Sequence, residues 1–140
     1  MKKIIVTIAL LSFGLFFSQK SQNYFEISYS SICCGTPSTG PVTSYLSQFQ
    51  KKNKTKAFEV FQQPGLGREG EFNLYIGVDQ LSKSQKTIFM KGLKTAISSQ
   101  NTKRNESRDG IVYFESSKTV TKSDLASIKN LKVYKNNLTK

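Results

Sequence analysis

Bulky apolar residues and polar residues recur along this chain with two different periods, which predict a mixture of strands and helices. Residues 72–76 alternate strictly between apolar and other side chains, and residues 24–32 hold five bulky apolar or aromatic side chains among small polar ones. Both segments are therefore predicted to be strands. Shorter apolar runs predict strands at 57–61 and 111–114 and a final edge strand at 131–134.

Two longer segments show the spacing of a helix that buries one face. Pro41 suits a first helical turn, and the apolar residues after it recur at i, i+3, i+4 and i+7. This first helix is expected to end in the polar run 51–54. A second helix begins at a capping box formed by Ser82 and Gln85. The buried stripes of the two helices are predicted to be Val42, Tyr45, Leu46 and Phe49, and Phe89, Leu93, Ala96 and Ile97.

One residue weakens the second helix, and one short helix follows the last main strand. Gly92 lies inside the second helix, where glycine costs about 1 kcal/mol relative to alanine. Thr121 and Asp124 are predicted to cap a brief third helix that carries Leu125 and Ile128.

The resulting order, strand, helix, strand, strand, helix, strand, predicts a ferredoxin-like α+β fold. In this βαββαβ arrangement an antiparallel sheet carries two helices on one face, and here a short helix and an edge strand are added at the C-terminus. The loop after the first strand, the loop between the middle strands and the loop after the second helix then share one end of the sheet. We expect functional side chains to gather at that end.

The N-terminal segment, residues 1–19, is predicted to be a secretory signal peptide. Lys2 and Lys3 precede an apolar run over residues 4–17, which is too short to span a bilayer comfortably. An uncleaved signal anchor is the alternative, and it is the only membrane anchor that the sequence predicts. Lipid anchoring is disfavoured because Cys33 lies well downstream of the run. Residues 20–140 are expected to form one small exported domain, in the periplasm or outside the cell.

The chain is strongly basic, with 21 Lys and Arg residues against nine Asp and Glu residues. Removing residues 1–19 takes away two lysines and no acid, so the net charge falls only from +12 to +10. Such a charge favours contact with anionic envelope polymers, lipid headgroups or acidic proteins, and we expect no nucleic-acid partner for an exported protein. Because the lysines are scattered along the sequence, solubility alone is favoured over a dedicated anion site as the interpretation of this charge.

Cys33 and Cys34 are adjacent, so they cannot close a stabilising loop. Their Cα atoms must lie about 3.8 Å apart, below the usual disulfide span of about 4.4 Å or more. The alternatives are a labile vicinal disulfide, two free thiols, a bond to another chain, or a soft-metal site at Cys33 and Cys34. A structural alternative places one cysteine in the core and the other at a strand end. The chain has no histidine, which disfavours a closed zinc site.

Residues 65–70 read Gly-Leu-Gly-Arg-Glu-Gly and match the G-x-G-x-x-G pattern of nucleotide-binding loops. A dinucleotide site needs this pattern between a strand and a helix, whereas here a predicted strand follows it. A hairpin with glycines at positive φ is the better interpretation, and Pro64 supports a turn. Glu69 and Glu71 are a weak candidate for acid and base chemistry, and a solvated hairpin flank paired with Arg68 is favoured.

The sequence therefore predicts a non-enzymatic binding or interaction module for an anionic or protein partner of the cell envelope, with no cofactor. The competing hypothesis is a thiol-dependent domain, either soft-metal-binding or redox-responsive. A cysteine nucleophile is disfavoured because no histidine can serve as its base. The candidate site residues are Cys33, Cys34, Gly65, Gly67, Arg68, Gly70, Lys103, Arg104 and Arg108.

Overall fold

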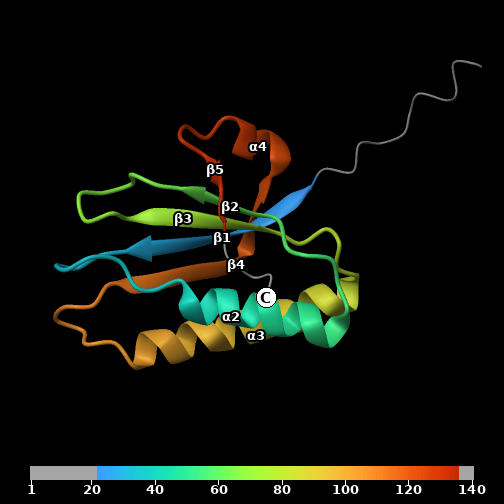
Figure 1. Cartoon of the computed structure of the whole chain (residues 1–140), viewed down its shortest axis with the longest axis horizontal. Helices are drawn as coiled ribbons and strands as arrows, with labels where there is room; N and C mark the ends of the chain where they lie inside the picture. The colour runs from blue at the N-terminus through green and yellow to red at the C-terminus, as the bar shows by residue number, and fades with distance from the viewer. Residues whose placement is uncertain (1–21, 136–140) are drawn as a thin grey trace, which may run out of the picture.

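A computed structural model describes residues 22–135 of the chain as a sheet with its two long helices on one side (Figure 1). The signal peptide predicted at residues 1–19 lies outside the described residues. Within them, no helix is both long and apolar enough to cross a membrane. The elements in chain order are β1 (Asn23–Ser30), α2 (Gly40–Asn53), β2 (Val60–Gln63), β3 (Phe72–Gly77), α3 (Lys83–Thr102), β4 (Ile111–Thr121), α4 (Lys122–Ala126) and β5 (Lys132–Val133).

The five described strands form one sheet in the order β4-β1-β3-β2-β5, and every neighbouring pair is antiparallel. Helices α2 and α3 lie together on one face of this sheet, and α4 lies on the other side (Figure 1). The predicted ferredoxin-like α+β fold is confirmed. The predicted C-terminal edge strand is also confirmed, because β5 pairs with β2 at the outside of the sheet.

The main core lies between the sheet and the two long helices, and Phe89 of α3 is at its centre. The Phe89 ring is fully buried and lies 5.0 Å from Phe58, 5.1 Å from Phe49 and 5.6 Å from Tyr45, measured between ring centroids. The predicted stripe residues Val42, Leu46, Leu93 and Ile97 are buried around it. The helical spacing of the sequence therefore identified this core correctly.

Gly92 is the residue that lets α2 and α3 pack closely. The Tyr45 hydroxyl donates a 2.9 Å hydrogen bond to the Phe89 main-chain carbonyl, and this places the Tyr45 ring directly over Gly92. A Cβ atom at position 92 would overlap that ring. The loss of helix propensity at Gly92 is thus offset by a contact between the helices that only glycine permits.

A second, smaller cluster covers the other face of the sheet at the end where β1 begins. It joins the buried side chains of Tyr24, Tyr75 and Val120 to Leu125 of α4. The capping box predicted for α4 is present, since Thr121 Oγ1 accepts a hydrogen bond from the Asp124 amide and Asp124 Oδ2 accepts one from the Thr121 amide. The short helix is thereby fixed over this part of the sheet.

Several predicted element boundaries were wrong. β1 ends at Ser30, and Ile32 is 51% exposed. β2 starts three residues later than expected, at Val60. β4 runs to Thr121 because, after an irregularity in its pairing with β1, Thr121 pairs with Asn23.

Candidate functional site

Three loops lie at the end of the sheet where β1 and β2 end, and we call this end the loop pole (Figure 1). It comprises residues 31–39, 64–71 and 103–110. The pairing of Ser30 with Ile111 places the first and third loops side by side. The structure therefore has the loop arrangement that the topology predicted.

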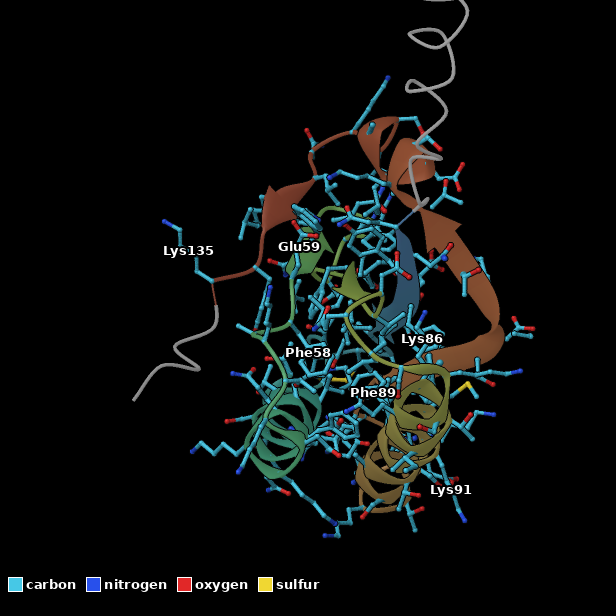
Figure 2. All side chains as sticks on the ribbon, turned by 90° about the vertical axis from the view of Figure 1, so that its right-hand side faces the viewer. Phe58, Glu59, Lys86, Phe89, Lys91 and Lys135 are labelled. Atoms are coloured by element: carbon cyan, nitrogen blue, oxygen red, sulfur yellow. A yellow bond between two sulfur atoms is a disulfide. The ribbon has the colours of Figure 1, made fainter. Side chains whose placement is uncertain are left out.

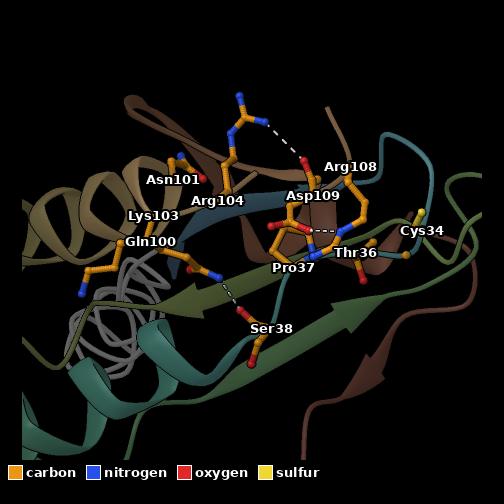
Figure 3. A pocket seen from close by; sticks show the side chains of 12 residues that line it. Cys34, Thr36, Pro37, Ser38, Gln100, Asn101, Lys103, Arg104, Arg108 and Asp109 are labelled. Carbon is orange, nitrogen blue, oxygen red and sulfur yellow. Dashed lines mark hydrogen bonds and ion pairs between the residues drawn. The ribbon is translucent and has the colours of Figure 1, made fainter. Parts of the chain in front are cut away.

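A cavity of about 320 Å³ lies between the first and third loops of the pole (Figure 3). Residues 34–38 form one wall, and residues between 100 and 110 form the other. Lys103, Arg104, Arg108 and Cys34 all line it, so four of the predicted site residues share one cavity.

The wall at residues 103–110 owes its shape to hydrogen bonds made by short polar side chains. Asp109 Oδ2 accepts a 2.8 Å hydrogen bond from the Asn105 amide, and Asn105 Oδ1 accepts hydrogen bonds from the amide and hydroxyl of Ser107. These contacts close a tight turn without a helix or strand.

The cavity floor is fixed by two side-chain amides at the end of α3. Gln100 Nε2 donates a 2.7 Å hydrogen bond to the Ser38 carbonyl, which joins the two walls. Asn101 donates to the Val112 carbonyl at 2.8 Å and accepts from the Val112 amide at 3.0 Å, as a neighbouring strand would. Gly110 is buried against Ser30, and a Cβ at position 110 would overlap the Ser30 carbonyl, so this close approach requires glycine. The cavity is therefore built on fixed backbone.

Three cations and one carboxylate line this cavity. Arg104 donates a 3.2 Å hydrogen bond to the Asp109 main-chain carbonyl, and Arg108 Nε lies 3.3 Å from Asp109 Oδ1. Within the described part of the chain the Lys103 ammonium has no hydrogen-bond or ion-pair partner. The Asn105 amide, and then Arg108, hold the pKa of Asp109 below its usual value. Asp109 thus stays ionised and offsets one of the three positive charges.

Cys33 and Cys34 form a vicinal disulfide at the rim of the cavity. Both residues are exposed, so the alternative that placed one cysteine in the core is wrong. Cys33 Sγ lies 3.6 Å from the Arg108 carbonyl oxygen. Because a disulfide sulfur carries no hydrogen, this is a packing contact between the two loops.

The glycine loop forms the turn of the β2–β3 hairpin and does not line the cavity. Gly65 and Gly70 have φ values of 76° and 84°, which confirms the predicted turn, and the Leu66 amide donates to the Glu71 carbonyl at 3.0 Å. Gly67 leaves room for the Glu71 carboxylate, which accepts a 2.9 Å hydrogen bond from the Glu69 amide. The expected pairing with Arg68 is absent from the ion pairs of the described residues.

The metal hypothesis for Cys33 and Cys34 has no support in the oxidised chain. Both sulfurs are held in the disulfide, and thiolates are the form that binds soft metals. Among residues 22–135 no group of three or more Cys, Asp or Glu side chains is arranged to hold a metal ion.

The sequence analysis missed Gln100, Asn101 and Asp109 as parts of this site. None of these three residues belongs to a motif that the sequence displays as a candidate site. Asp109 follows Asn105 by four residues, and this pairing of two turn-forming side chains was the available signal.

Comparisons with protein-family models, with curated proteins and with solved structures found no significant match to this chain.

Proposed function

We propose that this protein is an exported, non-enzymatic binding module that holds an anionic group of a ligand or partner protein in the cavity at the loop pole. The observation that carries the proposal is the convergence of Lys103, Arg104 and Arg108 on one cavity that contains a single acid, Asp109. Cationic side chains that share a cavity raise the local concentration of anions and donate charge-assisted hydrogen bonds to them.

The chemistry of the cavity supports binding better than catalysis. Its lining residues include three basic side chains, which suit anion contact, and no histidine exists anywhere in the chain to transfer a proton near neutral pH. Asp109 accepts a hydrogen bond from the Asn105 amide and pairs with Arg108. Both contacts favour its ionised form. A proton acceptor with a lowered pKa is a poor general base.

The size of the cavity limits the anionic group that it accepts. A volume of about 320 Å³ lies at the small end of the range for ligand pockets, so it has room for an anionic group that belongs to a small ligand. The Gln100–Ser38 and Asn101–Val112 hydrogen bonds hold the walls in place before binding, so little ordering is required when the anion enters.

Calorimetric titration of the full chain with inorganic phosphate tests this proposal. The double variant Arg104→Gln/Arg108→Gln is expected to bind phosphate at least about ten-fold more weakly, because each lost charge-assisted hydrogen bond is worth about 1.5–3 kcal/mol. A matched control, Lys129→Gln/Lys132→Gln, removes two exposed charges from the segment around β5, outside the cavity. Equal weakening by both variants would show that only overall charge matters and would contradict the proposal.

A second candidate function rests on the vicinal disulfide, which contacts the cavity loop through Cys33 and Arg108. In this case the protein is redox-responsive. A dithiol transfers two electrons and two protons to the sulfurs and is itself oxidised to a disulfide, so the Cys33–Cys34 bond breaks and two thiols form. The disulfide closes a ring with the backbone between Cys33 and Cys34. Once the bond is broken, this backbone is no longer constrained, which alters one wall of the cavity.

The redox candidate predicts that dithiothreitol changes the phosphate affinity of the native chain. It also predicts no effect of the reductant on the Cys33→Ser/Cys34→Ser variant. If the native chain binds phosphate equally before and after reduction, the binding module stands and the redox function is excluded. Intact mass, measured with and without reductant, checks that two hydrogens were gained.

A further inference from the structure

The layer formed by α2 and α3 has a distribution of charge that the sequence alone concealed. All nine acidic residues of the chain lie outside these two helices. The helices carry six lysines and no arginine, and two further lysines follow α2 directly. These are Lys51, Lys52, Lys83, Lys86, Lys91 and Lys94, followed by Lys54 and Lys56. Lysines that look scattered in sequence are therefore gathered on the helix layer.

Most of this charge is available to a partner. Every one of these lysines except Lys86 is exposed. Lys86 is half-buried and lies 3.3 Å from Asp79. Lys91 projects from α3 away from the sheet, whereas Phe58 and Phe89 lie between the helices and the sheet (Figure 2). Lys91 thus lies on the outer side of the layer.

An apolar groove lies between the two helices on this layer. It has a volume of about 540 Å³, and its walls include Phe49 and Tyr45 of α2 and Ile88 of α3. Ile88 is 62% exposed although it lies on a regular helix. Lys52 from α2 and Lys91 from α3 line the same groove. An exposed aliphatic side chain between lysines is a pattern typical of membrane-surface helices.

We propose that the outer side of the α2–α3 layer docks onto a bilayer that contains anionic lipids. Lysine ammonium groups approach the lipid phosphates while their aliphatic stems and Ile88 enter the boundary between headgroups and acyl chains. This surface is separate from the cavity at the loop pole and does not depend on the anion site proposed there.

The composition of the surface favours a bilayer over a nucleic acid. Arginine forks and exposed aromatic rings are the usual means of binding nucleic-acid phosphates and bases. The two helices contain no arginine, and their aromatic residues Tyr45, Phe49 and Phe89 are buried or half-buried. Lysine charge with an aliphatic centre suits a fluid layer of headgroups, which does not require fixed hydrogen-bond geometry.

A tryptophan substitution can report on this surface because the natural chain contains none. We suggest the full-chain variants Ile88→Trp on the helix layer and Val133→Trp on β5, where the native side chains are 62% and 61% exposed. With vesicles of phosphatidylglycerol and phosphatidylcholine, emission from the Ile88→Trp variant is expected to shift to shorter wavelength and to be quenched by brominated lipid. The Val133→Trp variant is expected to show neither effect. This readout is local, so it identifies the docked surface whatever the N-terminal apolar segment does.

Charge reversal then tests the lysines. In the Ile88→Trp background, Lys52→Glu/Lys91→Glu should raise the lipid concentration for half-maximal quenching at least about 25-fold, since each lysine near an anionic surface contributes a factor of about five. The control Lys129→Glu/Lys132→Glu has the same net charge and should stay within about two-fold of the parent, because its charges lie on the segment around β5 and outside both helices and the groove. Circular dichroism checks that each variant is folded.

Three results would overturn the proposal. They are quenching that is equal at positions 88 and 133, quenching at position 88 that survives the Lys52→Glu/Lys91→Glu change, and no response to vesicles. A response of the Ile88→Trp variant to duplex DNA but not to vesicles would assign the surface to nucleic acid instead.

Discussion

The two ends of the sheet are closed by different means. At the end where β1 begins, Tyr24, Tyr75, Val120 and Leu125 form a second hydrophobic cluster, and the acids nearby have internal partners. Glu59 accepts a 2.6 Å hydrogen bond from Tyr24, and Asp79 accepts hydrogen bonds from the Asn23 amide and Lys86. At the loop pole, polar loops surround a cavity whose cations exceed its acids. One end is therefore stabilised by buried apolar side chains, whereas the other leaves an excess of positive charge around a cavity.

The largest expected effect comes from the hydrophobic end. Leu125→Ala should lower the free energy of unfolding by about 2–3 kcal/mol, at the low end for a buried leucine because the cluster around α4 is small. Phosphate binding at the loop pole should be unchanged. Chemical denaturation and calorimetric titration of the same variant measure both quantities. A parallel loss of phosphate affinity would mean that the two ends are coupled and that the comparison is wrong.

An intermediate effect is expected at the floor of the cavity. Asn101→Ala removes both hydrogen bonds to Val112 and leaves a main-chain amide and carbonyl without those partners. The expected cost is about 1–2 kcal/mol of unfolding free energy, together with weaker phosphate binding. The exposed helix-surface change Thr95→Ala serves as a control for denaturation. If the two variants had the same free energy of unfolding, the two hydrogen bonds between Asn101 and Val112 would not stabilise the edge of the sheet as a neighbouring strand does.

The smallest effect, a pH dependence, involves one carboxylate at each end of the sheet. The Asn105 amide lowers the pKa of Asp109, and Thr121 lowers the pKa of Asp124, from ordinary values near 3.8. Because both folded-state values are lowered, the stability they contribute is complete above pH 4 and is lost as the pH falls further. Thermal unfolding from pH 7 to pH 2 should show this loss.

Single substitutions separate the two carboxylates in that titration. Asp124→Asn should reduce the acid sensitivity of the fold, while Asp109→Asn should in addition change phosphate binding near neutral pH, because Asp109 lines the cavity. An acid sensitivity that neither substitution alters would show that other groups control it.

The sequence predicted the elements well wherever local chemistry decides the structure. The Ser82–Gln85 capping box is present, with hydrogen bonds of 3.0 and 3.2 Å, and the apolar stripe after it is buried at Phe89, Leu93 and Ile97. Helix caps and periodic stripes depend on residues within a few positions of each other, which a sequence displays directly.

The candidate site was predicted only in part because its geometry depends on contacts between distant segments. The topology placed Cys34 beside Arg104 and Arg108, and the structure brings them to one cavity. The glycine loop belongs to the same end of the sheet, but β3 and β2 lie on the far side of β1 from β4, so it is excluded from the cavity. Gln100 joins Ser38 across 62 positions of the chain, and no local pattern indicates such a contact.

The most direct test of the anion site is the map of amide shifts produced by inorganic phosphate in ¹⁵N-labelled full chain. The account predicts that the largest saturable shifts occur at Lys103, Arg104, Arg108 and Gly110. Lys129 and Lys132 also have cationic side chains but lie outside the cavity, so the chemical shifts of their amides should barely change. Shifts spread evenly over lysines throughout the chain, with no saturation at the loop pole, would contradict the proposed function.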